Sequence, residues 1–191
     1  LIFSYTRQLK KVPCFLQNMV NHCIKSGIRI YTQAKIENAN KERADKINDP
    51  DRQKPKVALF TGCMVDYRVQ KVGYDLLKVL DALDIDIDIP EARSAADHHF
   101  LEPAEDVVQE LADINKEVFK DYDTVLTICA GCGATLKNDH PNFGNKLNVQ
   151  DISEFLIDKL DGEKMKEINA KVTWHDPCHL CRGQGMVEEP R

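Results

Sequence analysis

The chain has 191 residues, of which 42% are apolar and 30% are charged, and its formal net charge is −5. This length suits one medium-sized domain, and the negative charge argues against a broad surface for nucleic acid. No apolar stretch approaches the about 18 residues that cross a bilayer, and the first residues lack a signal-peptide pattern. We therefore expect a cytoplasmic protein, and we expect any association with a membrane to be through a partner.

Residues 1–55 are predicted to form a helical connector. The stretch FLQNMVNHCIKSG has apolar residues near helical spacing and ends at Gly27, a residue type that often follows a helix. DPDRQKPK then combines Asp, Pro and charges, as linkers do. The chain starts at Leu1 rather than Met and stops soon after a cysteine motif, so we also expect a fragment of a longer protein.

After residue 55 the sequence alternates between strand and helix patterns. Short apolar or alternating runs predict strands at residues 56–62, 85–89, 123–129, 146–150 and 171–176. Helical spacing predicts helices at residues 72–83, 104–122, 133–139 and 151–160, the last with Asp151 as N-cap. This rhythm predicts an α/β fold, with a mostly parallel sheet that has helices on both faces.

Seven cysteines are many for this length, and their odd number argues against a secreted disulfide framework. Cys14 and Cys23 do not share a helix face well, so we expect them to be structural. The other five follow predicted strands, in FTGC, TICAGCG and WHDPCHLC; they are Cys63, Cys129, Cys132, Cys178 and Cys181. Ligands of open α/β sheets bind beyond the carboxyl ends of strands, where helix N-termini stabilise thiolates. We therefore expect these cysteines to converge on one centre.

The residues alone leave the kind of centre open. Cys129-x-x-Cys132 is typical of metal or redox sites, whereas a single cysteine such as Cys63 is more often a small buried residue. Two such pairs also suit zinc, with Cys129, Cys132, Cys178 and Cys181 as ligands. Zinc ribbons, however, separate their pairs by roughly 15–20 residues, and here a strand and a helix intervene. A thioredoxin-like redox site fits less well. In the thioredoxin fold, the Cys-x-x-Cys motif opens the helix that follows an early strand of that fold.

Histidines near the last motif add further candidates. His175 and His179 flank Cys178 and are candidate ligands or proton carriers, although His175 at a strand end also suits a local hydrogen bond. His140 is expected at the surface and Trp174 in the core.

Three motifs together resemble the cysteine-rich CCG-domain family: VALFTGCMVDYR, DTVLTICAGCGATLKNDHP and VTWHDPCHLCRGQG. Among its members, the chain is similar to the catalytic iron–sulfur subunit of methanogen CoB–CoM heterodisulfide reductase and to that of thiol:fumarate reductase. The resemblance implies an electron-transfer subunit whose non-cubane 4Fe–4S clusters cleave a small-molecule disulfide in methanogenesis. It also implies partner subunits of ferredoxin, flavoprotein or membrane-cytochrome type. Its pattern places ligands at Cys63, Cys129, Cys132 and Cys178, and Cys181 falls where members vary. It identifies no catalytic residue.

The resemblance makes residues 56–165 a first CCG-type domain and residues 166–191 the truncated start of a second. The Cys-Cys-Gly of the family is missing from its place, where RSAADHHF stands. Ala92 to Ala104 can be back-translated so that a neighbouring frame encodes Cys-Cys-Gly-Ser-Pro, and we expect residues 92–104 to be translated out of frame. The alternative is a genuine loop with His98 and His99. Without these thiolates we expect an impaired redox subunit; the alternative is a zinc-binding or metal-free α/β domain without catalysis.

Overall fold

The computed structural model describes residues 51, 53–62, 65, 69–90, 105–160, 165 and 167–191. The predicted helical connector up to residue 50, the ligand candidate Cys63 and the segment 92–104 lie outside the described residues. Within the described part, no helix is long and apolar enough to cross a membrane.

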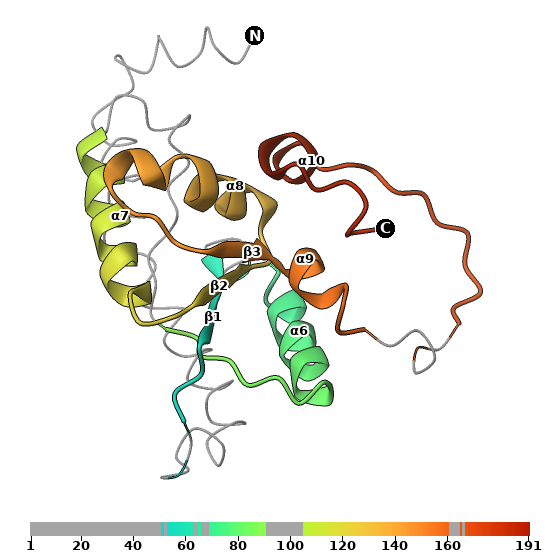
Figure 1. Ribbon diagram of the computed structural model, residues 1–191. Coiled ribbons are helices and arrows are strands. Elements are labelled where there is room, and N and C mark those ends of the chain that lie inside the picture. Colours follow the sequence, from blue (N-terminus) through green and yellow to red (C-terminus); the bar gives the residue numbers. More distant parts are fainter. Residues whose placement is uncertain are drawn as a thin grey trace, which may run out of the picture.

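Three short strands form a parallel sheet in the order β1-β2-β3 (Figure 1). They are β1 (Val57–Phe60), β2 (Thr124–Thr127) and β3 (Val149–Asp151). The register pairs Ala58 with Val125, and Val125 with Val149. On the free side of β1, the predicted strand 85–89 contributes an isolated parallel bridge at Asp88, whose carbonyl accepts the N–H of Leu59 at 2.8 Å. The predicted parallel sheet is confirmed.

One face of the sheet is covered by α6 (Gln70–Ala82) and α9 (Ile152–Leu156) (Figure 1). Side chains of a strand alternate between the two faces, so Leu59 and Leu126 point to this side. They pack in one buried cluster with Leu80 and its neighbours on α6, and the apolar residues of α9 pack against that cluster.

The other face is covered by α7 (Glu105–Phe119) and α8 (Ala130–Asn138). Here Phe60 and Val125, which alternate with the residues just named, pack against Phe119 of α7 and Leu136 of α8. Both faces of the sheet are therefore buried under helices, as the sequence predicted. A short 3-10 helix, η4 (His140–Phe143), follows α8.

The structure confirms the predicted helix start at Asp151. Its carboxylate accepts the backbone N–H of Ser153 at 3.0 Å and the Ser153 hydroxyl at 2.7 Å, which satisfies a free donor of the first turn of α9.

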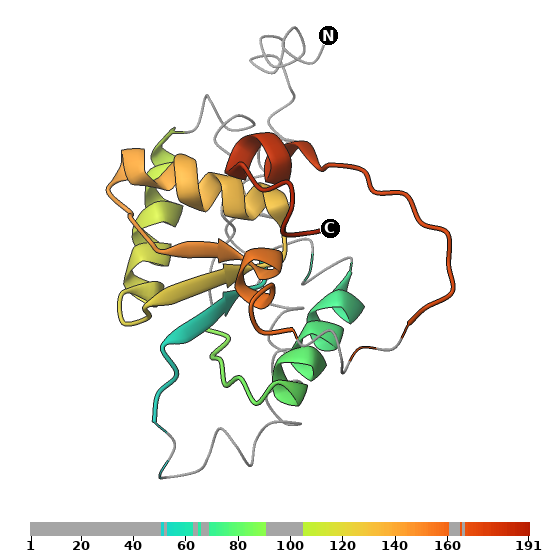
Figure 2. The ribbon, with the colours of Figure 1, turned by 45° about the vertical axis from the view of Figure 1, so that its right-hand side comes forward.

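The predicted strand at residues 171–176 is wrong. Residues 167–177 form an exposed arm without strand pairing, and it leads to the last helix, α10 (Cys178–Gln184) (Figures 1 and 2). Val172 is 89% exposed, and Trp174, expected in the core, is 48% exposed. A strand needs a hydrogen-bonded neighbour as well as a suitable residue pattern, and no described residue pairs with this segment.

The expectation of a surface position for His140 is also wrong. The imidazole is fully buried, and its Nδ1 accepts a hydrogen bond from Nδ2 of Asn145 at 3.0 Å. A buried ring can be retained in this way because its polar atoms find partners inside the protein.

Candidate functional site

The connections that follow β1 and β2 run on opposite faces of the sheet. The connection after β1 leads through α6 on one face to the bridge at Asp88, whereas the connection after β2 leads through α8 on the opposite face to β3. Open α/β sheets bind ligands at the carboxyl ends of the strands where successive connections part in this way. In this protein that place holds Gly62 after β1 and Cys129 after β2.

Cys129 is the N-cap of α8. Its backbone is extended, with φ −92° and ψ 113°, and its sulfur accepts the backbone N–H of Cys132 at 3.5 Å. Residues three positions apart are neighbours on a helix surface, so the motif places both sulfurs on the first turn. The two cysteines are thus neighbours, as the sequence predicted, because both lie at the start of the same helix.

Hydrogen bonds lower the pKa of Cys129 from 9.0 to about 6. The largest cause is the hydrogen bond from the Cys132 thiol, and the backbone N–H groups of Cys132 and Gly131 add to it. The charge of His179 acts in the same direction, while partial burial opposes the shift. Cys129 is therefore mostly a thiolate at neutral pH, which is the form that binds metals and attacks electrophiles.

Gly62 brings the loop after β1 against Cys132. Its φ is +69°, a conformation that residues with a side chain rarely adopt. A Cβ atom at this position would lie 2.9 Å from Sγ of Cys132. The residue directly before Cys63 thus lies beside the Cys129–Cys132 pair.

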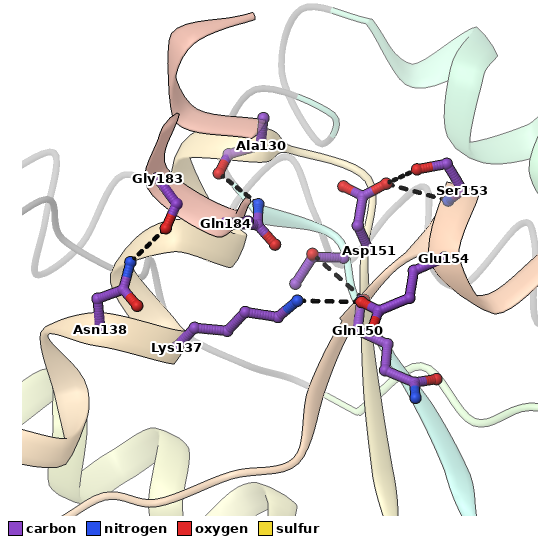
Figure 3. Close-up of polar contacts among 10 residues, drawn as sticks. Ala130, Lys137, Asn138, Gln150, Asp151, Ser153, Glu154, Gly183 and Gln184 are labelled. Atoms are coloured by element: carbon purple, nitrogen blue, oxygen red, sulfur yellow. Dashed lines mark hydrogen bonds and ion pairs between the residues drawn. The ribbon is translucent and has the colours of Figure 1, made fainter. Parts of the chain in front are cut away.

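The last helix packs on α8 (Figure 2). Nε2 of Gln184 donates to the carbonyl of Ala130 at 3.0 Å, and Nδ2 of Asn138 donates to the carbonyl of Gly183 at 2.7 Å (Figure 3). The ring of His179 lies against the first turn of α8, because a Cβ on Gly131 would be 3.2 Å from its Nδ1. The helix α10 therefore places the imidazole of His179 near Cys129.

A glycine makes this close approach of the helices possible. A Cβ on Gly133 would lie 2.7 Å from Nε2 of Gln184 and 2.8 Å from Oγ1 of Thr127. The sequence reasoning missed Gln184 and Gly133 as residues of the site. Their signal was the paired glycines in AGCGA and RGQG, which are typical of closely approaching backbones.

The structure does not bring all predicted ligands together. Cys178 and Cys181 lie on the first turn of α10, which follows the exposed arm rather than a strand, and His175 is exposed in that arm. Among the described residues, no three His, Cys, Asp or Glu side chains are grouped as a metal site would require. The four described cysteines, all free thiols, thus provide no ready zinc site of the predicted kind.

Comparison with known proteins points to one family. The model of the cysteine-rich CCG domain matches residues 57–137, a stretch that extends from β1 into α8 and includes the Cys129–Cys132 pair. No solved structure matches the chain significantly.

Three similar proteins come from methanogens. The chain is 48% identical over 137 residues to one subunit of the fumarate reductase (CoM/CoB) of Methanothermobacter marburgensis, a match that covers 71% of the chain. It is 43% identical over 144 residues, 74% of the chain, to an uncharacterised iron–sulfur protein of Methanocaldococcus jannaschii. It is 34% identical over 169 residues, 79% of the chain, to one subunit of the dihydromethanophenazine:CoB–CoM heterodisulfide reductase of Methanosarcina mazei. The matches span 28%, 29% and 41% of the lengths of these relatives.

Proposed function

Because the chain belongs through residues 57–137 to the CCG cysteine-rich domain family, we propose that it acts within an iron–sulfur oxidoreductase subunit. The proposed substrate is the disulfide between coenzymes M and B, which the name of the heterodisulfide reductase relative supports. The name of the fumarate reductase relative contains the same two coenzymes. The proposed partners are redox subunits that deliver electrons, since these relatives are themselves named as subunits. The zinc alternative has no support from the relatives, one of which is named an iron–sulfur protein.

The observation that carries the proposal is the Cys129–Cys132 pair at the ligand-binding edge of the sheet. Soft thiolates are the ligands that suit iron–sulfur clusters, and Cys129 is held as a thiolate. The pair therefore fits two ligand positions of a 4Fe–4S cluster. We propose Cys63 and Cys178 as further ligands, of which Cys63 would follow the loop that already touches Cys132. Cys181 is a candidate at a position where the family varies.

The chain's own residues prepare this site for a negatively charged group. The N–H groups at the start of α8 and the imidazole of His179 favour negative charge on sulfur. The helix α10 lies over that turn and shields one side of it. When bound, an iron–sulfur cluster supplies single electrons and an iron that can hold a substrate sulfur.

We further propose that residues 92–104 are an out-of-frame segment and that the chain as given is an impaired form. The support is that one choice of codons for this segment encodes Cys-Cys-Gly-Ser-Pro in a neighbouring frame, at the place where the family carries the missing ligands. Sequencing the gene through these codons tests the frame directly. An intact frame that encodes RSAADHHF would contradict this part of the proposal and leave the cluster with two ligands fewer.

The cluster itself is tested by anaerobic reconstitution of two chains, the chain as given and one in which the neighbouring-frame reading replaces residues 93–104. We expect the restored chain to be brown and to hold about four iron and four sulfide per chain, and the chain as given to hold clearly less. Iron and acid-labile sulfide analysis, absorption and electron paramagnetic resonance provide the readout. A change of the resonance spectrum on adding the coenzyme heterodisulfide tests the substrate.

Serine variants of the restored chain identify the ligands. Cys129→Ser and Cys132→Ser should each lose most of the iron, whereas Cys14→Ser should retain it, because Cys14 is expected to be structural. A colourless restored chain that holds zinc, or equal iron content in all three variants, would overturn the proposal.

A further inference from the structure

Two side-chain amides join α8 and α10, and each donates to a backbone carbonyl of the other helix (Figure 3). Nε2 of Gln184 donates to the carbonyl of Ala130 at 3.0 Å, and Nδ2 of Asn138 donates to the carbonyl of Gly183 at 2.7 Å. The two bonds are alike in chemistry but differ in place. Ala130 is the first residue of α8, directly after the first cysteine of the motif, whereas Asn138 is the last residue of that helix.

The amide of Gln184 is held in an orientation that leaves its oxygen without a partner. Oε1 is buried and has no hydrogen-bond partner among the described residues, although Nε2 is bonded. The amide lies against Gly133, where a Cβ would be 2.7 Å from Nε2 and 3.0 Å from Oε1. Turning the amide over would place Oε1 against the carbonyl of Ala130, and two acceptors repel each other. A buried acceptor without a partner costs stability, so an apolar side chain would dock the two helices at a lower cost.

The carbonyl that Gln184 holds belongs to the peptide group that carries the N–H of Gly131. A peptide group is planar, and in the usual trans form its C=O and N–H point in opposite directions. The N–H of Gly131 therefore points away from Gln184 and toward the start of the helix, where Cys129 is the N-cap. A Cβ on Gly131 would be 3.9 Å from Sγ of Cys129, and this N–H is one of the donors to that sulfur. Holding the carbonyl thus also fixes the direction of the donor.

We propose that Gln184 is a positioning residue that aims the N–H of Gly131 at Sγ of Cys129 through the peptide group that follows Ala130. Its consequence rests on the proposed function, because this sulfur is a proposed cluster ligand. Hydrogen bonds to ligand sulfurs are among the features that set the reduction potential of an iron–sulfur cluster. A well-aimed N–H favours the more negative, reduced form. Gln184 thereby raises the potential at which the site accepts an electron.

The metal-free full chain tests the geometry without a cluster. Gln184→Met keeps the length of the side chain and removes its amide, and Asn138→Leu is the matched change in the other bond. The exchange rate of the Gly131 N–H with water, measured by NMR on the isotope-labelled chain, reports the hydrogen bond of this group. We expect about fivefold faster exchange in Gln184→Met, as the loss of one neutral hydrogen bond gives, and an unchanged rate in Asn138→Leu.

Docking of α10 is followed in the same samples through the methyl group of Ala134, against which a Cβ on Gly183 would lie at 3.1 Å. The nuclear Overhauser contact between these two residues should persist in both variants, because the buried side chains of Leu180 and Met186 still hold this end of the chain. Equal exchange rates of the Gly131 N–H in the two variants, or loss of the Ala134 contact in Gln184→Met, would overturn the proposal. In either case Gln184 would be no more than a docking residue.

The restored chain, in which the neighbouring-frame reading replaces residues 93–104, tests the consequence. After anaerobic reconstitution, Gln184→Met should have a more negative midpoint potential than the unaltered restored chain, because a weaker N–H···S bond stabilises the reduced cluster less. Asn138→Leu should leave the potential unchanged. Redox titration followed by electron paramagnetic resonance measures the shift, and equal potentials in all three proteins would overturn the role at the cluster. A restored chain that binds no iron contradicts the proposed function instead, whereas the exchange rates of the metal-free chain still decide whether Gln184 positions the peptide group.

Discussion

At Cys129, three residues act on one sulfur atom: the thiol and N–H of Cys132 and the N–H of Gly131 donate hydrogen bonds to it, and His179 acts on it through charge. Each group favours the thiolate, and together they outweigh the partial burial that would favour the thiol. The position of Cys129 at the start of α8, beside Cys132 and His179, thus determines the ionisation of its thiol.

The lowered pKa of Cys129 predicts its pH dependence. In the metal-free chain, the rate of alkylation of Cys129 by iodoacetamide should rise with pH around a midpoint near 6, because the thiolate is the reactive form. In Cys132→Ala the midpoint should move upward, since the largest donor is lost. Mass spectrometry of the tryptic peptide 121–137 gives the rates, and a midpoint near 9.0 in the unaltered chain would contradict the assignment.

The lowered pKa of Cys129 also makes the stability of the folded chain depend on pH. The folded chain favours the thiolate more than the unfolded chain, whose pKa for this group is near 9.0. This sulfur therefore contributes stability that is fully present above about pH 9 and is lost as the pH falls through about 6.

Among the elements, the pair α8 and α10 determines the surroundings of the cysteines. α8 holds Cys129 and Cys132, while α10 brings His179 and Gln184 to its first two turns. The contact uses glycines on both sides: Gly133 on α8 and Gly183 on α10, where a Cβ would lie 3.1 Å from the Cβ of Ala134.

The two glycines should differ in their tolerance of alanine. Alanine is better than glycine in a helix by roughly 1 kcal/mol, and overpacking costs about 1–3 kcal/mol. Gly133→Ala places a Cβ 2.7 Å and 2.8 Å from atoms of Gln184 and the strand residue Thr127, so we expect net destabilisation and release of α10. Gly183→Ala, with its looser 3.1 Å contact, should be closer to neutral.

Urea unfolding measures this difference, and hydrogen exchange of residues 178–184 reports release of α10. The result that would contradict it is a Gly133→Ala variant as stable as Gly183→Ala, with unchanged exchange in α10.

For the whole molecule, stability comes from two buried clusters that share the same strands. Leu59 and Leu126 belong to the cluster under α6. Phe60 and Val125 belong to the cluster under α7 and α8. Because alternate residues of each strand belong to opposite clusters, loss of one face exposes the sheet that supports the other.

Neighbouring residues of α6 provide a matched test of this core. Leu80 is fully buried, so Leu80→Ala should lower the free energy of unfolding by about 2–5 kcal/mol through lost burial and a cavity. Val79 is 39% exposed, and Val79→Ala should change the free energy by no more than about 0.5 kcal/mol. Urea unfolding followed by far-ultraviolet circular dichroism should show a single transition. Separate transitions for the two faces would refute the shared-sheet account.

The fold class and most of its elements could be predicted from the amino-acid sequence alone. Periodicity over a few residues identified α6, α7, α8, α9 and the three paired strands, but it did not predict α10. The alternation of helices and strands required a parallel sheet covered on both faces, and the Cys-x-x-Cys spacing placed Cys129 beside Cys132. These features follow from local backbone geometry, so local patterns suffice to predict them.

Features that depend on distant segments emerged only from the folded arrangement. The strand pattern of residues 171–176 remained an exposed arm because no described segment pairs with it, and His140 was buried by the elements around it. The contact of Gly62 with Cys132, and the placing of His179 beside Cys129, join parts of the chain far apart in sequence. Such contacts depend on how packed elements meet in space, and no pattern within one element encodes them.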